Sequence, residues 1–186
     1  RDALVVAGHL LVVRADAAFA IPALYEALER RGGAYAIRLP ANDALERAIE
    51  DAAARKGVLM MPVFATERTQ EILHEINEMF QFKRVPAMPV FVDSPLAIKA
   101  TEVFSKYPNY YNEEVRQLYL KHPHLFQFKN LKMTQSVEES KAINSVPPPK
   151  VILAGSGMST GGRILHHEKR YLPDPNIIIF ITGLQA

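Results

Sequence analysis

Apolar residues along this chain alternate between short continuous runs and helical spacing. Continuous runs of a few residues, rich in β-branched side chains, are typical of buried strands. They occur at residues 10–13, 34–39, 58–63, 89–92, 151–154 and 177–181. Helical spacing predicts helices over residues 21–31, 44–54, 66–80, 95–106, 112–121, 136–144 and 164–172. This alternation predicts an α/β fold with three layers (α/β/α) and a mostly parallel, doubly wound sheet of about six or seven strands.

Polar residues and prolines mark where three of these helices begin. Ser94 precedes Pro95, the arrangement of a helix cap followed by proline in the first turn. Ser136 and Glu139, three residues apart, predict a capping box. Thr66 is placed to cap the helix that carries apolar residues up to Phe80.

A loop rich in glycine and serine joins the run at 151–154 to the helix at 164–172. It contains Gly155, Ser156, Gly157, Ser159, Gly161 and Gly162. Ligands of open α/β sheets bind at the carboxyl ends of strands, and a helix N-terminus there suits a phosphate. The spacing fits neither a P-loop, since Arg163 and Ile164 replace its lysine and hydroxyl residue, nor the dinucleotide fingerprint. A simple tight turn between strand and helix is the alternative.

Composition narrows the classes of protein. The 186 residues are 48% hydrophobic and 23% charged, as in ordinary globular proteins, and the net charge of +2 does not by itself indicate nucleic acid. No cysteine is present, which excludes disulfides, thiolate zinc sites and a cysteine nucleophile. No apolar run approaches the ~20 residues that cross a bilayer, and Arg14 and Asp16 interrupt the one apolar stretch near the N-terminus. A cytoplasmic protein without membrane contact is expected.

The chain is expected to form one domain over residues 1–186. The predicted strand at 58–63 follows the preceding helix without a linker. A separate domain of about 50 residues would bury too little surface alone. Residues 1–51 are therefore expected to extend the same sheet as residues 52–186.

Three blocks carry a family resemblance. They are KGVLMMPVFATERTQEIL (56–73), MPVFVDSPLAIKATEVF (88–104) and AGSGMSTGGRILHHEKRYLPDPNIIIFITGLQA (154–186). In this order, from about Lys56 to Ala186, they resemble the β-CASP region of metallo-β-lactamase-fold nucleases, which include ribonuclease J-like enzymes and cleavage-and-polyadenylation endonucleases. The resemblance implies a domain that covers the lactamase site and helps to hold an RNA or DNA strand.

Residues from about Leu11 to Asp51 are similar instead to the ribonuclease-H-like domain of DDE transposases. In that family the residue that matches Asp16 is one of three metal-binding acids. A solvated or capping Asp16 is the alternative, because a nuclease site of that class needs a second acid nearby. If both resemblances hold, the chain is a chimera, from a natural rearrangement or an artificial fusion.

The β-CASP resemblance implies two zinc ions, held in the lactamase domain by a His-x-His-x-Asp-His cluster and further His and Asp residues. The His-x-His at 122–124 is followed by Phe126 and Gln127 where the pattern has Asp and His. His166 and His167 are adjacent on a helix and point about 100° apart. No catalytic residue, metal ligand or cofactor is therefore expected in this chain.

The residues expected to bind nucleic acid come from the same resemblance, which places the glycine loop near the scissile phosphate. Arg68 and Ser94 would line that cleft, although Arg68 can pair with Glu71 and Ser94 can simply cap its helix. The tyrosines at 107, 110, 111 and 119 either stack bases or pack an edge of the fold. The full expected set is Arg68, Ser94, Ser156, Gly157, Ser159, Gly161, Gly162 and Arg163.

Three functions follow as hypotheses. The first is a non-catalytic fragment of a β-CASP nuclease that binds single-stranded RNA or DNA, with a metallo-β-lactamase domain as its missing partner. The second is a folded chimeric scaffold without a function of its own. The third is a metal-dependent nuclease that uses Asp16. Apolar surface left by the missing domain would also favour self-association.

Overall fold

The structure is a computed structural model, and it describes residues 3–6, 10–15, 35–37, 41–108, 111, 119–120 and 125–181. Several predictions lie outside the described residues. These are the helix at 21–31, most of the helix at 112–121, and the side chains of Asp16, Tyr110, His122 and His124. Among the described residues, no helix has the length and apolarity needed to cross a membrane.

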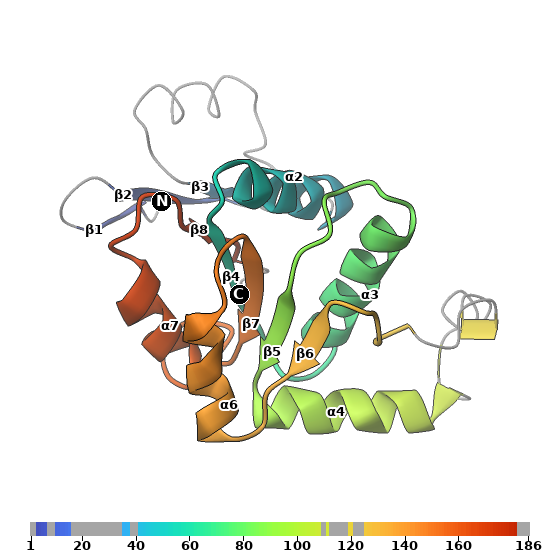
Figure 1. Cartoon of the computed structure of the whole chain (residues 1–186). Coiled ribbons are helices and arrows are strands. Elements are labelled where there is room, and N and C mark those ends of the chain that lie inside the picture. The colour runs from blue at the N-terminus through green and yellow to red at the C-terminus, as the bar shows by residue number, and fades with distance from the viewer. Residues whose placement is uncertain are drawn as a thin grey trace.

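Five parallel strands form the larger sheet, in the order β6-β5-β7-β4-β8 (Figure 1). The strands are β4 (Val58–Pro62), β5 (Val90–Asp93), β6 (Leu131–Met133), β7 (Lys150–Ala154) and β8 (Ile178–Ile179). The chain crosses the sheet in one direction from β4 through β5 to β6 and then returns through β7 to β8. Because crossovers between parallel strands are right-handed, this reversal places helices on both faces of the sheet. The predicted α/β class with a mostly parallel sheet is confirmed.

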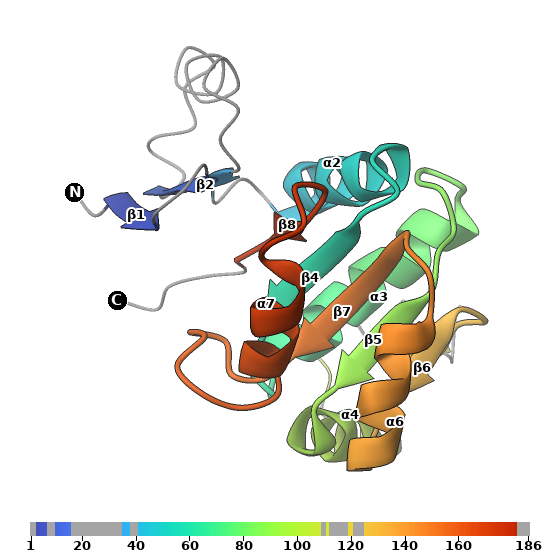
Figure 2. The same ribbon diagram turned by 60° about the vertical axis from the view of Figure 1, so that its left-hand side comes forward.

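Helices cover both faces of this sheet (Figure 2). They are α2 (Ala41–Ala54), α3 (Arg68–Gln81), α4 (Pro95–Lys106), α6 (Val137–Ala142), the short 3-10 helix η3 (Ile143–Ser145) and α7 (Ile164–Tyr171). Alternate residues of β4 point to opposite faces. Met61 packs in a core with residues of α2, α3 and α4, whereas Met60 packs in a second core with residues of η3 and α7. The three-layer prediction is therefore confirmed.

The first strands form a separate three-stranded sheet, which corrects one prediction. β1 (Ala3–Val6) pairs antiparallel with β2 (Leu10–Ala15), and β2 pairs parallel with β3 (Tyr35–Ile37). The expected extension of one sheet to six or seven strands is wrong for the described residues. The physical reason is that β8 pairs with β4 and occupies the edge where an N-terminal strand would have added. The single-domain organisation stays a prediction.

Two of the three predicted helix starts are confirmed. Ser94 accepts a hydrogen bond from the Ala97 N–H at 3.3 Å, with Pro95 as the first residue of α4. The capping box of α6 is complete, because the Ser136 hydroxyl accepts from the Glu139 N–H and the Glu139 carboxylate accepts from the Ser136 N–H. The predicted Thr66 cap is wrong, because α3 begins after Glu67 and has no side-chain cap.

Candidate functional site

The candidate site lies where the parallel strands end, which we call the carboxyl edge. β5, β7 and β4 are neighbours in the sheet, so the segments that follow them come together there. A Cβ built on Gly155 would lie 3.4 Å from the Ser94 hydroxyl, and a Cβ on Gly157 would lie 2.7 Å from the Phe64 ring. The structure therefore brings the predicted Ser94 beside the predicted glycine loop, and it adds Phe64, which sequence reasoning missed.

The glycine loop closes on itself through backbone hydrogen bonds. The Ser156 N–H donates to the Gly161 carbonyl at 3.1 Å, and the Ile164 N–H donates to the Gly155 carbonyl at 3.0 Å. Gly162 has a φ of 74° and passes so close to Gly155 that a Cβ would lie 2.3 Å from its carbonyl oxygen. Glycine is required at position 162 for both reasons.

One side of this loop is open. No atom lies within 4 Å of a Cβ built on Gly161. Among the described residues, the N–H groups of Gly161 and Gly162 have no hydrogen-bond partner. The loop also leads directly into α7, whose N-terminal end carries partial positive charge. Unpaired N–H groups at a helix N-terminus favour an anion such as a phosphate.

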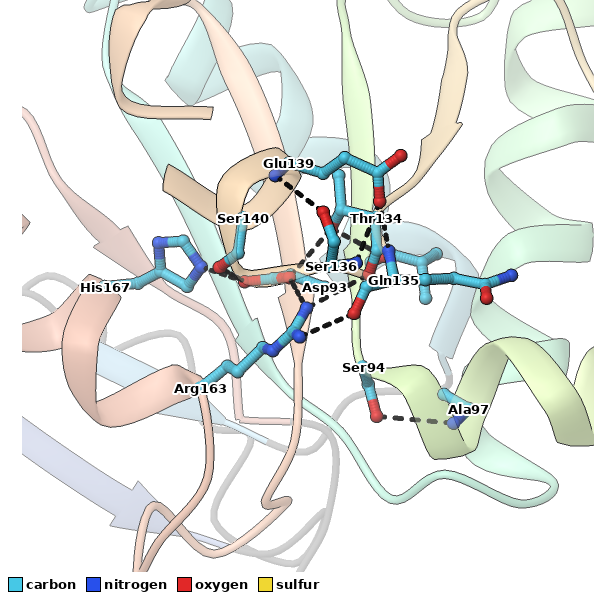
Figure 3. Close-up of polar contacts among 11 residues, drawn as sticks. Asp93, Ser94, Ala97, Thr134, Gln135, Ser136, Glu139, Ser140, Arg163 and His167 are labelled. Carbon is cyan, nitrogen blue, oxygen red and sulfur yellow. Dashed lines mark hydrogen bonds and ion pairs between the residues drawn. The ribbon is translucent and has the colours of Figure 1, made fainter. Parts of the chain in front are cut away.

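Arg163 is held inside the protein rather than extended toward a ligand (Figure 3). Its guanidinium donates to the Asp93 carboxylate at 2.7 Å and to the carbonyls of Thr134 and Gln135 at 3.1 and 2.7 Å. Its side chain is 21% exposed. Arg163 thus connects β5, the segment after β6 and the start of α7. Direct phosphate binding by Arg163 stays a prediction.

Asp93, at the end of β5, is the centre of this polar network and is fully buried. It accepts hydrogen bonds from Thr134 Oγ1 at 2.7 Å, Ser140 Oγ at 2.6 Å and Arg163 Nη1 at 2.7 Å, and His167 Nε2 lies 2.7 Å away. Burial alone would raise the Asp93 pKa, but these hydrogen bonds outweigh it and hold the pKa well below its usual range. The carboxylate can only accept, so His167 Nε2 carries the proton.

Sequence reasoning identified only the neighbouring Ser94, as a helix cap, and did not anticipate this network around Asp93. One signal was present, because Arg163 and His167 are four residues apart and therefore share a face of α7. Two side chains on one face can contact a common partner, but the sequence does not identify it.

The described residues do not fit a two-zinc site. Asp93 and His167 are bonded to each other, and the Arg163 guanidinium stands beside them where a cation would have to lie. Within the described part of the chain, no group of three His, Asp or Glu side chains could hold a metal ion. The position of the zinc ions in the lactamase domain stays a prediction.

Arg68, the first residue of α3, lies among acids. Its Nη1 is 2.6 Å from a carboxylate oxygen of Glu71, as the alternative reading of the sequence had it, and 33% of its side chain is exposed. The charges of Glu71, Arg68 and Glu78 all act on Glu75. Nucleic-acid binding by Arg68 stays a prediction.

Glu75 provides a pH-dependent prediction. Burial, followed by repulsion from Glu71, raises its pKa from 4.5 to about 7. The folded chain then binds this proton more tightly than the unfolded chain, so stability is lost as the pH rises from 4.5 to about 7. Glu75→Gln is expected to raise the free energy of unfolding at pH 8 by on the order of 1–2 kcal/mol, allowing for solvent screening.

Urea unfolding at two pH values measures this effect. The gain in the free energy of unfolding should disappear near pH 4, where Glu75 is largely protonated in both the folded and the unfolded wild-type chain. Glu102→Gln, on the exposed side of α4, is the matched control and should change little at either pH. An equal gain at both pH values would show that the charge of Glu75 is not the cause.

The segments that follow β4, β5, β6 and β7 also carry exposed apolar side chains near the carboxyl edge. These are Phe64 after β4, Leu96 after β5, Val137 after β6 and Met158 after β7, with exposed fractions from 39% to 67%. Such surface favours association, so the self-association that the sequence suggested stays a prediction. By contrast, the predicted stacking tyrosines Tyr111 and Tyr119 pack edge-to-face at 5.7 Å, as in the packing alternative.

Comparison with known proteins adds the following. A family model described as the Beta-Casp domain matches residues 69–186. Ribonuclease TTHA0252 of Thermus thermophilus is 39% identical over 137 residues, which are 74% of this chain and 31% of that protein. Transcription termination factor FttA of Methanosarcina mazei is 31% identical over 159 residues, 83% of this chain and 25% of that protein. The RNase J-like protein of Methanocaldococcus jannaschii is 32% identical over 151 residues, 79% of this chain and 34% of that protein.

The chain thus spans only about a quarter to a third of the length of these relatives. The matched residues 69–186 include Ser94, the glycine loop and Arg163, and begin directly after Arg68. The candidate site at the carboxyl edge is therefore almost wholly within the matched region.

Proposed function

This chain belongs to the Beta-Casp domain family, and we propose that it binds single-stranded RNA, or single-stranded DNA, at the glycine loop without cleaving it. Two of the relatives are named as a ribonuclease and an RNase J-like protein, which supports a nucleic-acid strand as the ligand. Cleavage, with two zinc ions, belongs in this proposal to a metallo-β-lactamase domain that acts as the partner of this chain.

The open side of the glycine loop carries the proposal. The N–H groups of Gly161 and Gly162, which have no partner within the described part of the chain, lie just before α7, where a phosphate of the strand would be stabilised. Ser156 and Ser159 add hydroxyls beside them, although Ser159 Oγ also donates to Glu168 Oε1 at 2.5 Å. Arg68, Ser94, Gly157 and Arg163 complete the proposed interface, the latter two chiefly by shaping the loop.

Gly161→Asp tests this directly. No atom lies within 4 Å of the new Cβ, so the variant should fold as the wild type does while placing a negative charge beside the proposed phosphate. It is expected to weaken binding of a labelled oligouridine about 5- to 10-fold at about 50 mM salt. Fluorescence anisotropy of the 186-residue chain measures the change.

Gly161→Ala is the control, because it fills the same open space without charge and should bind as the wild type does. Equal affinities of Gly161→Asp and wild type would show that the glycine loop does not contact the bound strand. If the wild type does not bind oligouridine even at low salt, the proposed function is wrong.

One observation favours a second candidate, a chimeric scaffold without a function of its own. The family model begins at residue 69, and β1, β2 and β3 form their own sheet before it. Against a junction near residue 51, the match to FttA of Methanosarcina mazei covers 83% of this chain and therefore includes residues before that position. A single cooperative thermal transition that RNA does not shift would support this candidate over the first. The nuclease hypothesis depends on Asp16, which lies outside the described residues, and it too stays a prediction.

A further inference from the structure

Phe64 is an aromatic residue that the fold holds at the carboxyl edge instead of in the core. It lies two residues after the end of β4, and 39% of its surface is exposed. Its neighbour Val63 is buried and continues the pairing of β4 with β7, because the Val63 N–H donates to the Ala154 carbonyl at 3.0 Å. The chain therefore turns outward at Phe64 itself.

One face of the Phe64 ring lies against the glycine loop. A Cβ on Gly157 would lie 2.7, 2.9 and 3.0 Å from Cδ2, Cε2 and Cγ, three consecutive atoms of the ring. Nearly equal distances to neighbouring atoms place that position over the ring face, since an approach in the ring plane would leave the flanking atoms much farther away. Glycine at position 157 thus lets the aromatic ring lie flat on the backbone of the loop.

The backbone at Phe64 is fixed by two buried side chains of α3. Thr69 Oγ1 donates to the Phe64 carbonyl at 2.6 Å, and Gln70 Nε2 donates to the Ala65 carbonyl at 3.2 Å. Both residues are at most 3% exposed. An exposed aromatic ring on a backbone held in this way is preorganised, so little conformational entropy is lost when a ligand contacts it.

We propose that Phe64 stacks on an unpaired nucleobase of the strand whose phosphate binds the glycine loop. This inference rests on the proposed function and adds a base-contacting residue to it. Stacking on an aromatic side chain tolerates any base, because every base has a π-face. The site therefore selects single strands over duplexes, in which the bases are already stacked on each other.

The absence of tryptophan from the sequence makes the test specific. Phe64→Trp introduces a single indole at the proposed platform, and a base stacked on it should quench its fluorescence when oligouridine is added. Phe82→Trp is the matched control. Phe82 is 65% exposed at the C-terminal end of α3, away from the carboxyl edge, and its indole should not respond.

Affinity supplies the second measurement. Phe64→Leu is expected to weaken oligouridine binding about 5- to 100-fold, whereas Phe64→Tyr and Phe82→Leu should bind as the wild type does. An oligonucleotide of abasic sugar-phosphates should bind wild type and Phe64→Leu equally, because it offers no base to stack.

The outcomes separate this inference from the proposed function. If the wild type binds oligouridine and Phe64→Leu binds it equally well, the stacking role is wrong and the phosphate-binding loop stands. If Phe64→Leu weakens the abasic strand as much as oligouridine, the ring only supports the loop and the inference is again wrong. If the wild type binds neither strand, both proposals fall together.

Discussion

Replacing Asp93 with alanine is expected to lower the free energy of unfolding by about 3–5 kcal/mol. The substitution leaves Arg163 without its acid and removes the acceptor of the Thr134 and Ser140 hydroxyls in a buried site. His167, which is 3% exposed, also loses its partner. Since a domain of this size is stable by about 5–15 kcal/mol, the loss is a large part of the total. Equilibrium unfolding in urea measures it.

Two further variants separate charge from packing. Asp93→Asn keeps the shape of the side chain but not its charge. Its free energy of unfolding should therefore lie between those of the wild type and Asp93→Ala. Asp51→Ala, on the exposed side of α2, should stay within about 0.5 kcal/mol of wild type. If Asp93→Ala were as mild as Asp51→Ala, the network would not hold the carboxyl edge together.

The same network has a predictable pH dependence. Because the Asp93 pKa is lowered in the folded chain, its contribution is present above the ordinary pKa of an aspartate and is lost as the pH falls below it. The difference in stability between wild type and Asp93→Asn should therefore shrink as the pH falls below about 4. A difference that stayed constant down to pH 3 would contradict the ionised, hydrogen-bonded state of Asp93.

The sequence predicted the elements of the five-stranded sheet where the signal is local. Continuous apolar runs identified β4, β5 and β7, and the Ser94 and Ser136 caps placed the starts of α4 and α6. These features depend on residues within a few positions of each other. The glycine loop was found for the same reason, as a run of small residues between a strand and a helix.

Features that depend on pairing between distant segments were not predicted. β6 has only three residues, all at least partly exposed at the sheet edge, so it has no continuous buried run. The Asp93 network joins residues more than 40 positions apart, from β5 to α6 and α7. The N-terminal strands were assigned to the wrong sheet because strand patterns do not reveal which edge β8 occupies. Phe64 was not singled out because its exposure depends on where β4 ends.

Gly162→Ala is expected to destabilise the chain by about 2–3 kcal/mol. The residue has a φ of 74°, which alanine adopts with strain. The added Cβ would also lie 2.3 Å from the Gly155 carbonyl oxygen, a backbone atom that cannot rotate away. That carbonyl accepts from the Ile164 N–H, so its displacement would disturb the start of α7. Urea unfolding measures the loss, and oligouridine binding should weaken because the free N–H groups of the loop move.

The adjacent glycine is the matched control. Gly161→Ala adds the same methyl group one residue earlier, where φ is not positive and no atom lies within 4 Å. It should be neutral, or stabilising by about 0.4–1 kcal/mol through the lower entropy of the unfolded chain. Equal effects of the two substitutions would mean that the loop is not closed on Gly155, and the phosphate-binding geometry proposed for it would then lose its support.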